Sequence, residues 1–407
     1  MLTIGVDIGG TKVAAGVVDP HGQILDRVKH PTPAEDPRAL ADVVARAVGE
    51  LRARRDSGEI GAVGVGVAGF VDEDRATVQV AVNIGLRDHP LRDRVQERVG
   101  LPVVIENDAN AAAWAEARFG AGRDSDHIVC ITLGTGIGGG LVLGGKLHRG
   151  RYGVAAEIGH YRMVPHGRRC ACGNHGCWEQ YASGSALVAE GRDLARADPV
   201  AAERMLKLAD GSVEGIEGQV ITQAALEGDP AALECFEAVA DWTGRGLADL
   251  AAILDPECFI VGGGVSDAGE MLLDPVRASF ARNVSGGPGR RLADVRVAEL
   301  GGEAGIVGAG GGPGPTLTPA SATRTAAVPG RGTAAVRAEK KGAGPVPEAY
   351  FFRLRSEDLS ALRSSLRARR SSLRRARSAL RRSLSSACCS RLASLASASC
   401  SCFTAWA

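Results

Sequence analysis

Long apolar segments are absent from the 407-residue sequence. No apolar run approaches the roughly 18 residues from which a membrane-spanning helix is recognised. Asp7 also interrupts the N-terminus, where a signal peptide would be apolar. We therefore expect a cytoplasmic protein without a membrane partner, whose ten cysteines remain reduced.

The chain also has almost no net charge, because 48 Lys and Arg residues balance 47 Asp and Glu residues. The two signs are distributed unevenly, however. Residues 312–407 contain 17 basic and 4 acidic residues, which leaves 31 and 43 for residues 1–311 and a net charge of −12 there. Because an acidic body repels nucleic-acid phosphates, we expect no nucleic-acid partner.

The sequence does not support either of two common nucleotide-binding motifs. The G-x-x-x-x-G-K-[ST] phosphate loop does not occur, so the chain is not a P-loop enzyme. The dinucleotide pattern G-x-G-x-x-G also fails, because Gly9-Gly10 leads into a second predicted strand rather than into a helix.

Three glycine-rich turns follow predicted strands, at residues 7–12, 134–140 and 262–264. Glycine lets backbone N–H groups approach phosphate oxygens closely, although a tight turn explains any one of these segments equally well. Thr11 and Thr135 add hydroxyl groups, and Asp7 could bind magnesium through water. Together these features favour a nucleoside triphosphate.

Apolar strand patterns alternate with helical patterns along residues 1–311. The longest helix is predicted to begin at Asp229-Pro230, and the alanine-rich segment Ala109–Phe119 is predicted to be helical. Such alternation predicts an α/β protein with helices packed on mixed sheets. Strands are predicted at Leu2–Val6, Val13–Val18, Ile60–Val67, Val103–Glu106, Ile128–Leu133, Ile137–Leu143, Cys258–Val261 and Val295–Leu300.

The composition changes at Gly312, after which Pro, Gly, Ser, Ala and Arg dominate. Such a segment cannot bury a core, so we interpret it as a disordered, even non-native, extension. A membrane-surface or nucleic-acid contact is the alternative, because leucines recur there with the spacing of an amphipathic, arginine-rich helix. These are Leu359, Leu362, Leu366, Leu373, Leu380 and Leu384.

His160, Cys170, Cys172 and Cys177 form the pattern H-x9-C-x-C-x4-C. Three thiolates and one imidazole complete a tetrahedral shell, which predicts a structural Zn²⁺ site. A disulfide is disfavoured by the geometry of Cys-x-Cys, and a nucleic-acid-binding zinc ribbon by the acidic body. Glu157 and Glu179 flank the cluster without being needed as ligands, so they are free to face something else.

Asp108 is the candidate general base. It follows a predicted strand and begins a predicted helix, where a carboxylate more commonly caps the helix. Phosphoryl transfer to a hydroxyl group, however, needs a carboxylate that orients and deprotonates the nucleophile. The neighbouring Asn107 supplies the paired donor and acceptor that a sugar diol prefers.

Five segments together resemble the ROK family of sugar kinases and sugar-responsive repressors: residues 7–12, 106–110, 133–138, 157–160 and 170–179. The resemblance covers residues 1–311 and implies an actin-like ATPase (ribonuclease H-like) fold with two domains around a cleft. The small domain would comprise residues 1–108, with 295–311 returning to it. The large domain would comprise residues 109–294, and 312–407 would be a disordered basic tail.

The resemblance also implies an activity, namely ATP- and Mg²⁺-dependent phosphorylation of glucose at the 6-hydroxyl. The alternatives are a kinase for mannose, N-acetylmannosamine or fructose, with polyphosphate as another donor, and a non-catalytic sugar-responsive regulator. Such regulators carry an N-terminal helix-turn-helix, for which the position of Asp7 leaves no room. A homo-oligomer, dimer or tetramer, is expected.

The residue roles implied by the resemblance are as follows. Asp108 is the base, and the sugar contacts are Asn83, Asn107, Asp108, Glu157, His160 and Glu179. ATP contacts are Asp7, Gly9, Gly10, Thr11, Lys12, Gly134, Thr135, Gly136, Gly262, Gly263 and Gly264. The metal ligands are His160, Cys170, Cys172 and Cys177.

Overall fold

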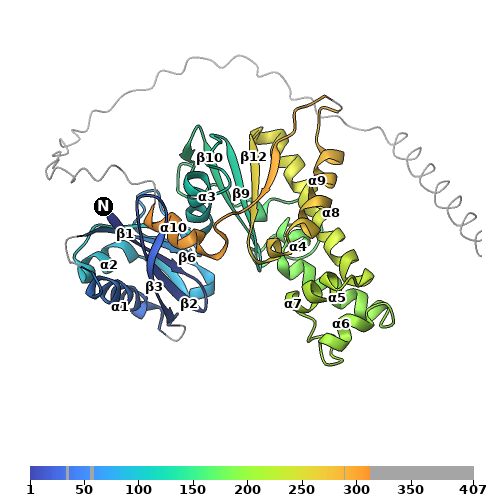
Figure 1. Cartoon of the computed structure of the whole chain (residues 1–407), viewed down its shortest axis with the longest axis horizontal. Helices are drawn as coiled ribbons and strands as arrows, with labels where there is room; N and C mark the ends of the chain where they lie inside the picture. Colours follow the sequence, from blue (N-terminus) through green and yellow to red (C-terminus); the bar gives the residue numbers. More distant parts are fainter. Residues whose placement is uncertain (34–35, 56–58, 288, 312–407) are drawn as a thin grey trace, which may run out of the picture. The chain divides into compact units, whose positions relative to one another are not determined.

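The computed structural model describes residues 1–33, 36–55, 59–287 and 289–311 (Figure 1). Within these residues the strands form two five-stranded mixed sheets and one three-stranded antiparallel sheet. Helices pack on both large sheets, which confirms the expected α/β architecture. The leucine pattern and the rest of residues 312–407 lie outside the described residues.

The first sheet has the strand order β3-β2-β1-β4-β8. Its first three strands form an antiparallel meander, whereas β4 and β8 run parallel to β1. This register brings the carboxyl ends of β1, β4 and β8 to one edge. The strands are β1 (Leu2–Ile8), β2 (Lys12–Val18), β3 (Ile24–Pro31), β4 (Ile60–Val67) and β8 (Val103–Asn107).

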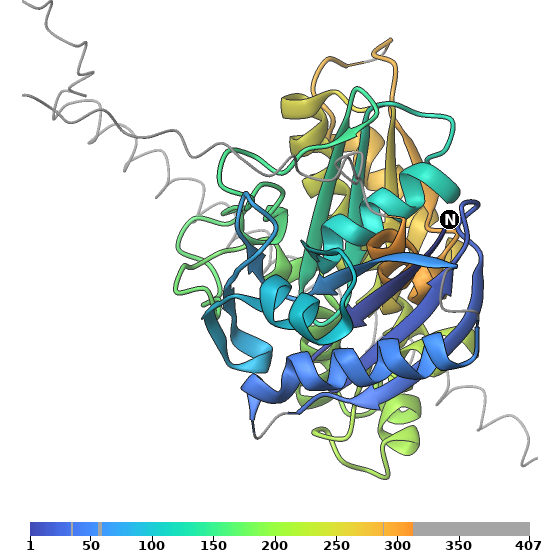
Figure 2. The ribbon, with the colours of Figure 1, turned by 90° about the vertical axis from the view of Figure 1, so that its left-hand side faces the viewer.

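Strand β1 is covered on both faces. Ile4, Val6 and Ile8 are fully buried in the core that includes helix α1 (Leu40–Ala53), which runs along one face of the sheet (Figure 2). The alternating positions Gly5 and Asp7 face helix α10 (Ala304–Gly310). Asp7 is therefore the one carboxylate on an otherwise apolar strand.

Helix α10 lies in backbone contact with the first sheet. A Cβ added to Gly5 would overlap the carbonyl oxygen of Ile306, and one added to Gly64 would overlap that of Ala309. On the other side of α10, a Cβ at Gly308 would overlap the carbonyl oxygen of Ala111 in helix α3 (Asp108–Phe119). Glycine at these positions therefore allows the sheet, α10 and α3 to pack closely.

The second sheet repeats the arrangement of the first, with the order β11-β10-β9-β12-β13. An antiparallel hairpin is followed by parallel strands in both cases. The strand expected at Val295–Leu300 is shorter in the structure, because the chain leaves this sheet after Val297 and turns into α10. The strands are β9 (Ile128–Leu133), β10 (Ile137–Leu143), β11 (Lys146–Leu147), β12 (Cys258–Gly262) and β13 (Asp294–Val297).

Most of the remaining helices share one hydrophobic core with the second sheet. The core there contains Trp178, Phe236 and Phe259, all almost completely buried. The predicted cap at Asp229 is confirmed, because its carboxylate accepts the Ala232 N–H at 2.9 Å. The helices are α4 (Glu179–Ala182), α5 (Gly184–Ala197), α6 (Glu203–Leu208), α7 (Gly218–Leu226), α8 (Pro230–Leu254) and α9 (Glu270–Asn283), with α2 (Leu91–Val99) on the first sheet.

The small sheet was not predicted from the sequence. It consists of β5 (Phe70–Val71), β6 (Val78–Ala81) and β7 (Leu86–His89). Strands of two to four residues are too short to show a hydrophobic period. The β5–β6 turn is held by Asp72, whose carboxylate accepts the Ala76 and Thr77 N–H groups.

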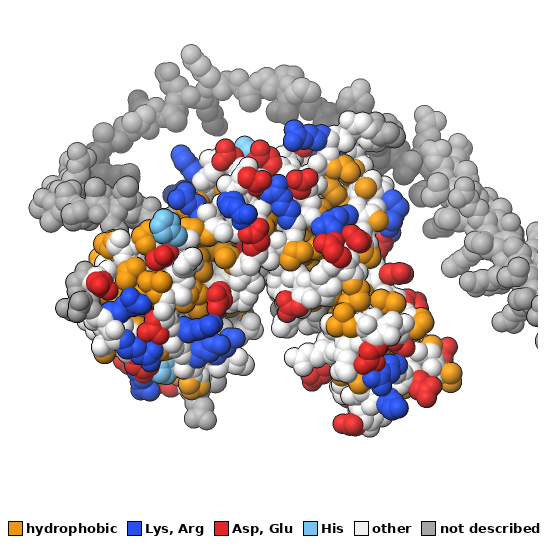
Figure 3. Space-filling view, in the orientation of Figure 1, with side chains coloured by type: hydrophobic (Ala, Val, Ile, Leu, Met, Phe, Trp, Pro, Cys, Tyr) orange, Lys and Arg blue, Asp and Glu red, His pale blue; other side chains and the backbone are white. Residues whose placement is uncertain are grey.

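The surface of the described residues carries charges of both signs. Figure 3 shows Lys and Arg side chains interspersed with Asp and Glu on the face in view. None of the helices in the described part of the chain is long and apolar enough to cross a membrane.

The close packing of α10 leads to a stability prediction. Gly308→Ala should lower the free energy of unfolding by about 1–3 kcal/mol, because the added methyl group meets the α3 backbone. Gly49→Ala in α1 is the matched control, since a Cβ there has no atom within 4 Å and should stabilise the helix. If urea denaturation showed the same change in free energy of unfolding for both substitutions, close packing at Gly308 would be contradicted.

Candidate active site

Asn107 and Asp108 lie at the junction between β8 and α3. The Asn107 side chain caps the helix, because its Oδ1 accepts the Asn110 N–H at 2.9 Å. Asp108 is therefore the first helical residue and not the N-cap residue. Burial raises the pKa of the Asp108 carboxyl, while a hydrogen bond from Asn107 acts in the opposite direction.

The amide group of Asn107 is already engaged within the protein. Its Nδ2 donates to the Gly69 carbonyl oxygen at 3.2 Å and to Asp108 Oδ1 at 3.1 Å. Both N–H bonds are thereby used, and one acceptor position remains on Oδ1. A sugar hydroxyl group can therefore accept a hydrogen bond from Asn107 Nδ2 only if it displaces the Gly69 carbonyl oxygen or Asp108 Oδ1.

The first glycine turn, residues 9–11, joins β1 to β2. The Gly9 N–H donates to the Lys12 carbonyl oxygen at 2.9 Å, and Thr32 Oγ1 donates to the Gly9 carbonyl oxygen at 2.7 Å. A Cβ added to Gly10 would lie 3.8 Å from the Asn83 Cβ. The structure therefore places exposed Asn83 beside this turn.

Asp7 lies immediately before this turn. Its pKa is raised to about 6, mainly by burial and then by the negative charge of Asp108, whereas Lys12 lowers it. Two carboxylates and one ammonium group therefore lie close together at the edge of the first sheet.

Glu157, His160 and Glu179 come from the segment that follows the second hairpin. His160 Nδ1 lies 3.5 Å from Glu179 Oε1. The pKa of Glu157 is raised mainly by burial, with further contributions from Asp108 and Glu179, whereas His160 lowers it. The structure thus brings Glu157 near Asp108, although the two are distant in sequence, and also near His160 and Glu179.

The predicted metal ligands converge. The ligand atoms of His160, Cys170, Cys172 and Cys177 all lie within 4.8 Å of one another. Cys172 Sγ is 3.6 Å from Cys177 Sγ, too far for a disulfide, and Cys170 Sγ is 3.7 Å from His160 Nδ1. These separations match ligands spaced tetrahedrally around a metal at about 2.0–2.3 Å, so the residues fit a zinc ion.

The cluster is anchored to helix α8. Trp178, next to Cys177, packs so closely that a Cβ on Gly246 would overlap its ring, and its Nε1 donates to the Trp242 carbonyl oxygen at 2.9 Å. Within the cluster segment, Gly173 and Gly176 have φ values of 93° and 78°. Glycine adopts these left-handed conformations without strain, which allows the tight turn between the last two cysteines.

Glu179 lies between the cluster and the second glycine turn. Its Oε1 accepts from Cys170 Sγ at 3.0 Å. Its Oε2 would lie 2.5 Å from a Cβ added to Gly136. One carboxylate therefore contacts both the metal-binding segment and a predicted phosphate loop.

A cavity of about 990 Å³ adjoins the second and third glycine turns. Gly134, Thr135 and Gly264 line it, whereas Gly262 ends β12 and Gly263, with a φ of 87°, shapes the turn. The opposite walls come from α5 and α7, which motif analysis did not identify as part of the site. Their lining residues are Gly184, Ser185, Leu187, Val188, Ala189, Arg192, Asp193, Arg196, Gly218, Gln219, Thr222, Gln223 and Leu226.

Known proteins are similar to this chain over most of residues 1–311. A model of the ROK family matches residues 3–310. The chain is 56% identical over 308 residues to the glucokinase of Streptomyces coelicolor, covering 76% of this chain and 96% of that protein. It is 35% identical over 311 residues to the N-acetylmannosamine kinase of Shigella boydii, covering 76% and 97%.

One solved structure is similar over the same share of the chain. It is a ROK family glucokinase from Streptomyces griseus in complex with glucose and AMPPNP, with 57% sequence identity and a TM-score of 0.70. The match covers 76% of this chain and 98% of that one. The kinase fold expected from the sequence is thereby confirmed.

The raised pKa of Asp7 predicts a pH-dependent stability difference. Between about pH 4 and pH 6 the folded protein keeps a proton that the unfolded chain has lost, so stability falls as pH rises. Asp7→Asn should therefore exceed the parent in free energy of unfolding by up to about 3 kcal/mol at pH 7. The difference should vanish near pH 4 in magnesium-free urea titrations. If the free energies of unfolding of Asp7→Asn and the parent differed by the same amount at every pH, the raised pKa of Asp7 would be contradicted.

Proposed function

The chain belongs to the ROK family, and from that premise we propose that it is an ATP-dependent glucokinase that phosphorylates glucose at the 6-hydroxyl. The single observation that carries this conclusion is the 56% identity to a glucokinase over 308 residues. The site agrees chemically, because a buried carboxylate lies near groups suited to bind a sugar and near glycine turns suited to bind phosphate.

In this proposal Asp108 accepts the proton of the sugar 6-hydroxyl. Burial raises its pKa, so that the ionised carboxylate is a stronger base than an exposed aspartate. The hydrogen bond from Asn107 Nδ2 fixes the orientation of the carboxylate. Glu157, Glu179, His160, Asn107 and Asn83 hold the other hydroxyl groups of the sugar and so aim the 6-hydroxyl at the phosphate.

ATP occupies the cavity lined by Gly134, Thr135 and Gly264 in this proposal. The backbone at Gly134–Gly136 and the first glycine turn, together with Lys12, hold its phosphates, and the turn at Gly262–Gly264 adjoins the adenosine. Asp7 would hold the magnesium ion of ATP through a water molecule, and that ion supplies positive charge at the phosphates when bound.

Zinc would have a structural role. His160 Nδ1 faces the three cysteines, which leaves Nε2 free to contact the sugar. A bound metal ion would thus fix the imidazole ring, which lies 3.5 Å from the Glu179 carboxylate. Cytoplasmic location, the homo-oligomer and the domain division after residue 108 stay predictions.

The function is tested by a coupled assay with ATP across glucose, mannose, N-acetylmannosamine and fructose. We expect the highest kcat/KM with glucose and glucose 6-phosphate as the product. A clear preference for another hexose would replace glucose in the proposal, and phosphorylation of none of them would overturn the kinase assignment.

Asp108→Asn is the matched inactive variant for that assay. It should bind glucose and ATP like the parent while kcat falls by about 10²–10⁴-fold, the usual contribution of a general base. Calorimetric titration measures the binding and steady-state kinetics the turnover. Near-normal turnover would remove Asp108 from the base role.

Zinc analysis tests the metal assignment. The purified protein should contain one zinc ion per chain, and Cys172→Ser should lose it and show a raised KM for glucose. His175→Ala is the control, because His175 is exposed in the same segment but is not among the four ligands. Full activity of a metal-free preparation would refute the proposed role.

A further inference from the structure

Glu106, the residue before Asn107, is a buried carboxylate. Only 3% of the residue is exposed. A buried charge is strongly destabilising unless it is paired and hydrogen-bonded. Glu106 is paired with two arginines, Arg75 in the β5–β6 turn at 3.3 Å and Arg149 after β11 at 3.0 Å. Sequence analysis predicted neither partner.

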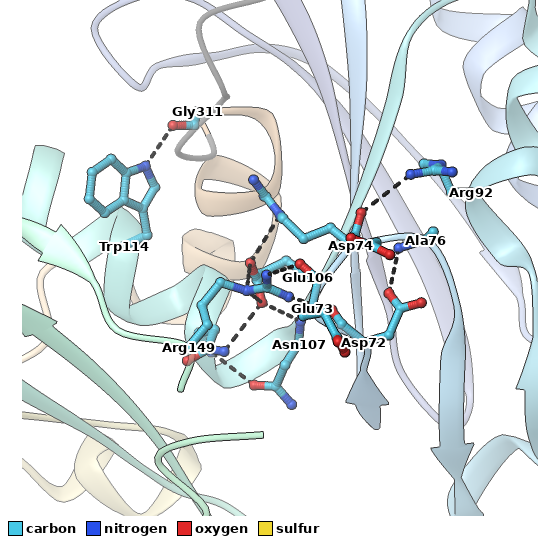
Figure 4. Close-up of polar contacts among 12 residues, drawn as sticks. Asp72, Glu73, Asp74, Ala76, Arg92, Glu106, Asn107, Trp114, Arg149 and Gly311 are labelled. Carbon is cyan, nitrogen blue, oxygen red and sulfur yellow. Dashed lines mark hydrogen bonds and ion pairs between the residues drawn. The ribbon is translucent and has the colours of Figure 1, made fainter. Parts of the chain in front are cut away.

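Arg149 also binds the backbone of the β5–β6 turn. Its two terminal nitrogens donate to the carbonyl oxygens of Asp72 at 3.0 Å and Glu73 at 3.2 Å. Figure 4 shows the guanidinium group between this turn and the Glu106 carboxylate. One side chain from the segment after β11 thus joins β8 of the first sheet to the β5–β6 turn.

The Glu106 carboxylate in turn contacts the start of α3. Its Oε1 accepts the Asn107 N–H at 3.0 Å and Asn110 Nδ2 at 3.2 Å. Asn107 then donates to Asp108 Oδ1 at 3.1 Å. A continuous series of polar contacts therefore runs from Arg149 to the proposed base.

Arg149 also begins the segment that leads to Glu157. The Ala155 N–H donates to the Arg149 carbonyl oxygen at 3.1 Å. Within this segment, a Cβ on Gly153 would overlap the Val71 carbonyl oxygen, so the backbone lies directly on β5. Movement of Arg149 would therefore disturb the approach to Glu157 as well as the start of α3.

We propose that Arg149 is a positioning residue that sets the sugar-binding geometry, because its guanidinium group holds Glu106 and the β5–β6 turn in one arrangement. Through these contacts it fixes Asn107 and Asp108 relative to Glu157. The inference rests on the proposed sugar-kinase function. Arg149 itself touches neither the nucleotide cavity nor the metal ligands among its described contacts.

The test compares variants of the full chain on the sugar that the parent phosphorylates best. Arg149→Met should lower kcat/KM for the sugar by about 10²-fold, the cost of an ångström-scale misplacement. The KM for ATP should stay within about twofold of the parent, because the nucleotide cavity keeps its lining. Arg149→Lys should recover only part of the loss, since an ammonium group cannot bridge the carboxylate and both carbonyls.

Two further variants separate positioning from stability. Arg151→Met is the matched control, because Arg151 lies on the same segment but is exposed, and its kinetics should match the parent. Glu106→Gln with Arg149→Met removes the carboxylate and one of its two arginines, which leaves the net charge of this group unchanged. This double variant should therefore fold, with the sugar KM still raised.

Several results would overturn the proposal. These are parental sugar kinetics in folded Arg149→Met, an equal rise in the KM for ATP, or parental sugar KM in the double variant. Failure of every Arg149 variant to fold would make Arg149 a stability residue instead. If the parent phosphorylates no hexose, the proposed function fails, which is a separate outcome measured on the parent alone.

Discussion

Helix α3 is in close contact with elements of both large sheets, and the proposed base depends on that packing. A Cβ on Gly140 of β10 would overlap Ala113, and one on Gly138 would lie 3.0 Å from the Ala109 Cβ. On the opposite side, Gly308 allows α10 to reach the α3 backbone, and Trp114 Nε1 donates to the Gly311 carbonyl oxygen at 2.7 Å (Figure 4). The start of α3 is therefore fixed in space, which allows a single carboxylate there to orient a substrate.

Two polar arrangements complete the site, and each holds charged or metal-binding side chains in a fixed position. On one side, Glu106 is neutralised by arginines from separate segments. On the other, the cysteine cluster gathers ligands that a metal ion would hold, beside Glu179. Each arrangement contacts proposed sugar-binding residues directly: Glu106 contacts Asn107, and His160 of the cluster lies beside Glu179. The sugar geometry is thus set by the supporting contacts as much as by the contacting residues themselves.

The sequence revealed the parts of the site whose chemistry is local. The spacing of His160 and the cysteines predicted the cluster, and Asp229-Pro230 predicted the start of α8. It could not distinguish Asn107 from Asp108 as the helix cap, because both residue types cap helices well. The partners of Glu106 also escaped prediction, since Arg149 lies 43 residues along the chain and such pairs leave no local pattern. The walls from α5 and α7 were missed for the same reason.

The most direct test of the account is a crystal structure of this protein with glucose and a non-hydrolysable ATP analogue. The account predicts that the glucose 6-hydroxyl lies about 2.6–3.2 Å from the Asp108 carboxylate. That hydroxyl should also point at the terminal phosphate held by the Gly134–Gly136 turn, with the Arg149–Glu106 contact intact. A sugar that presents a different hydroxyl group to Asp108, or an analogue bound outside the cavity lined by Gly134, Thr135 and Gly264, would contradict it.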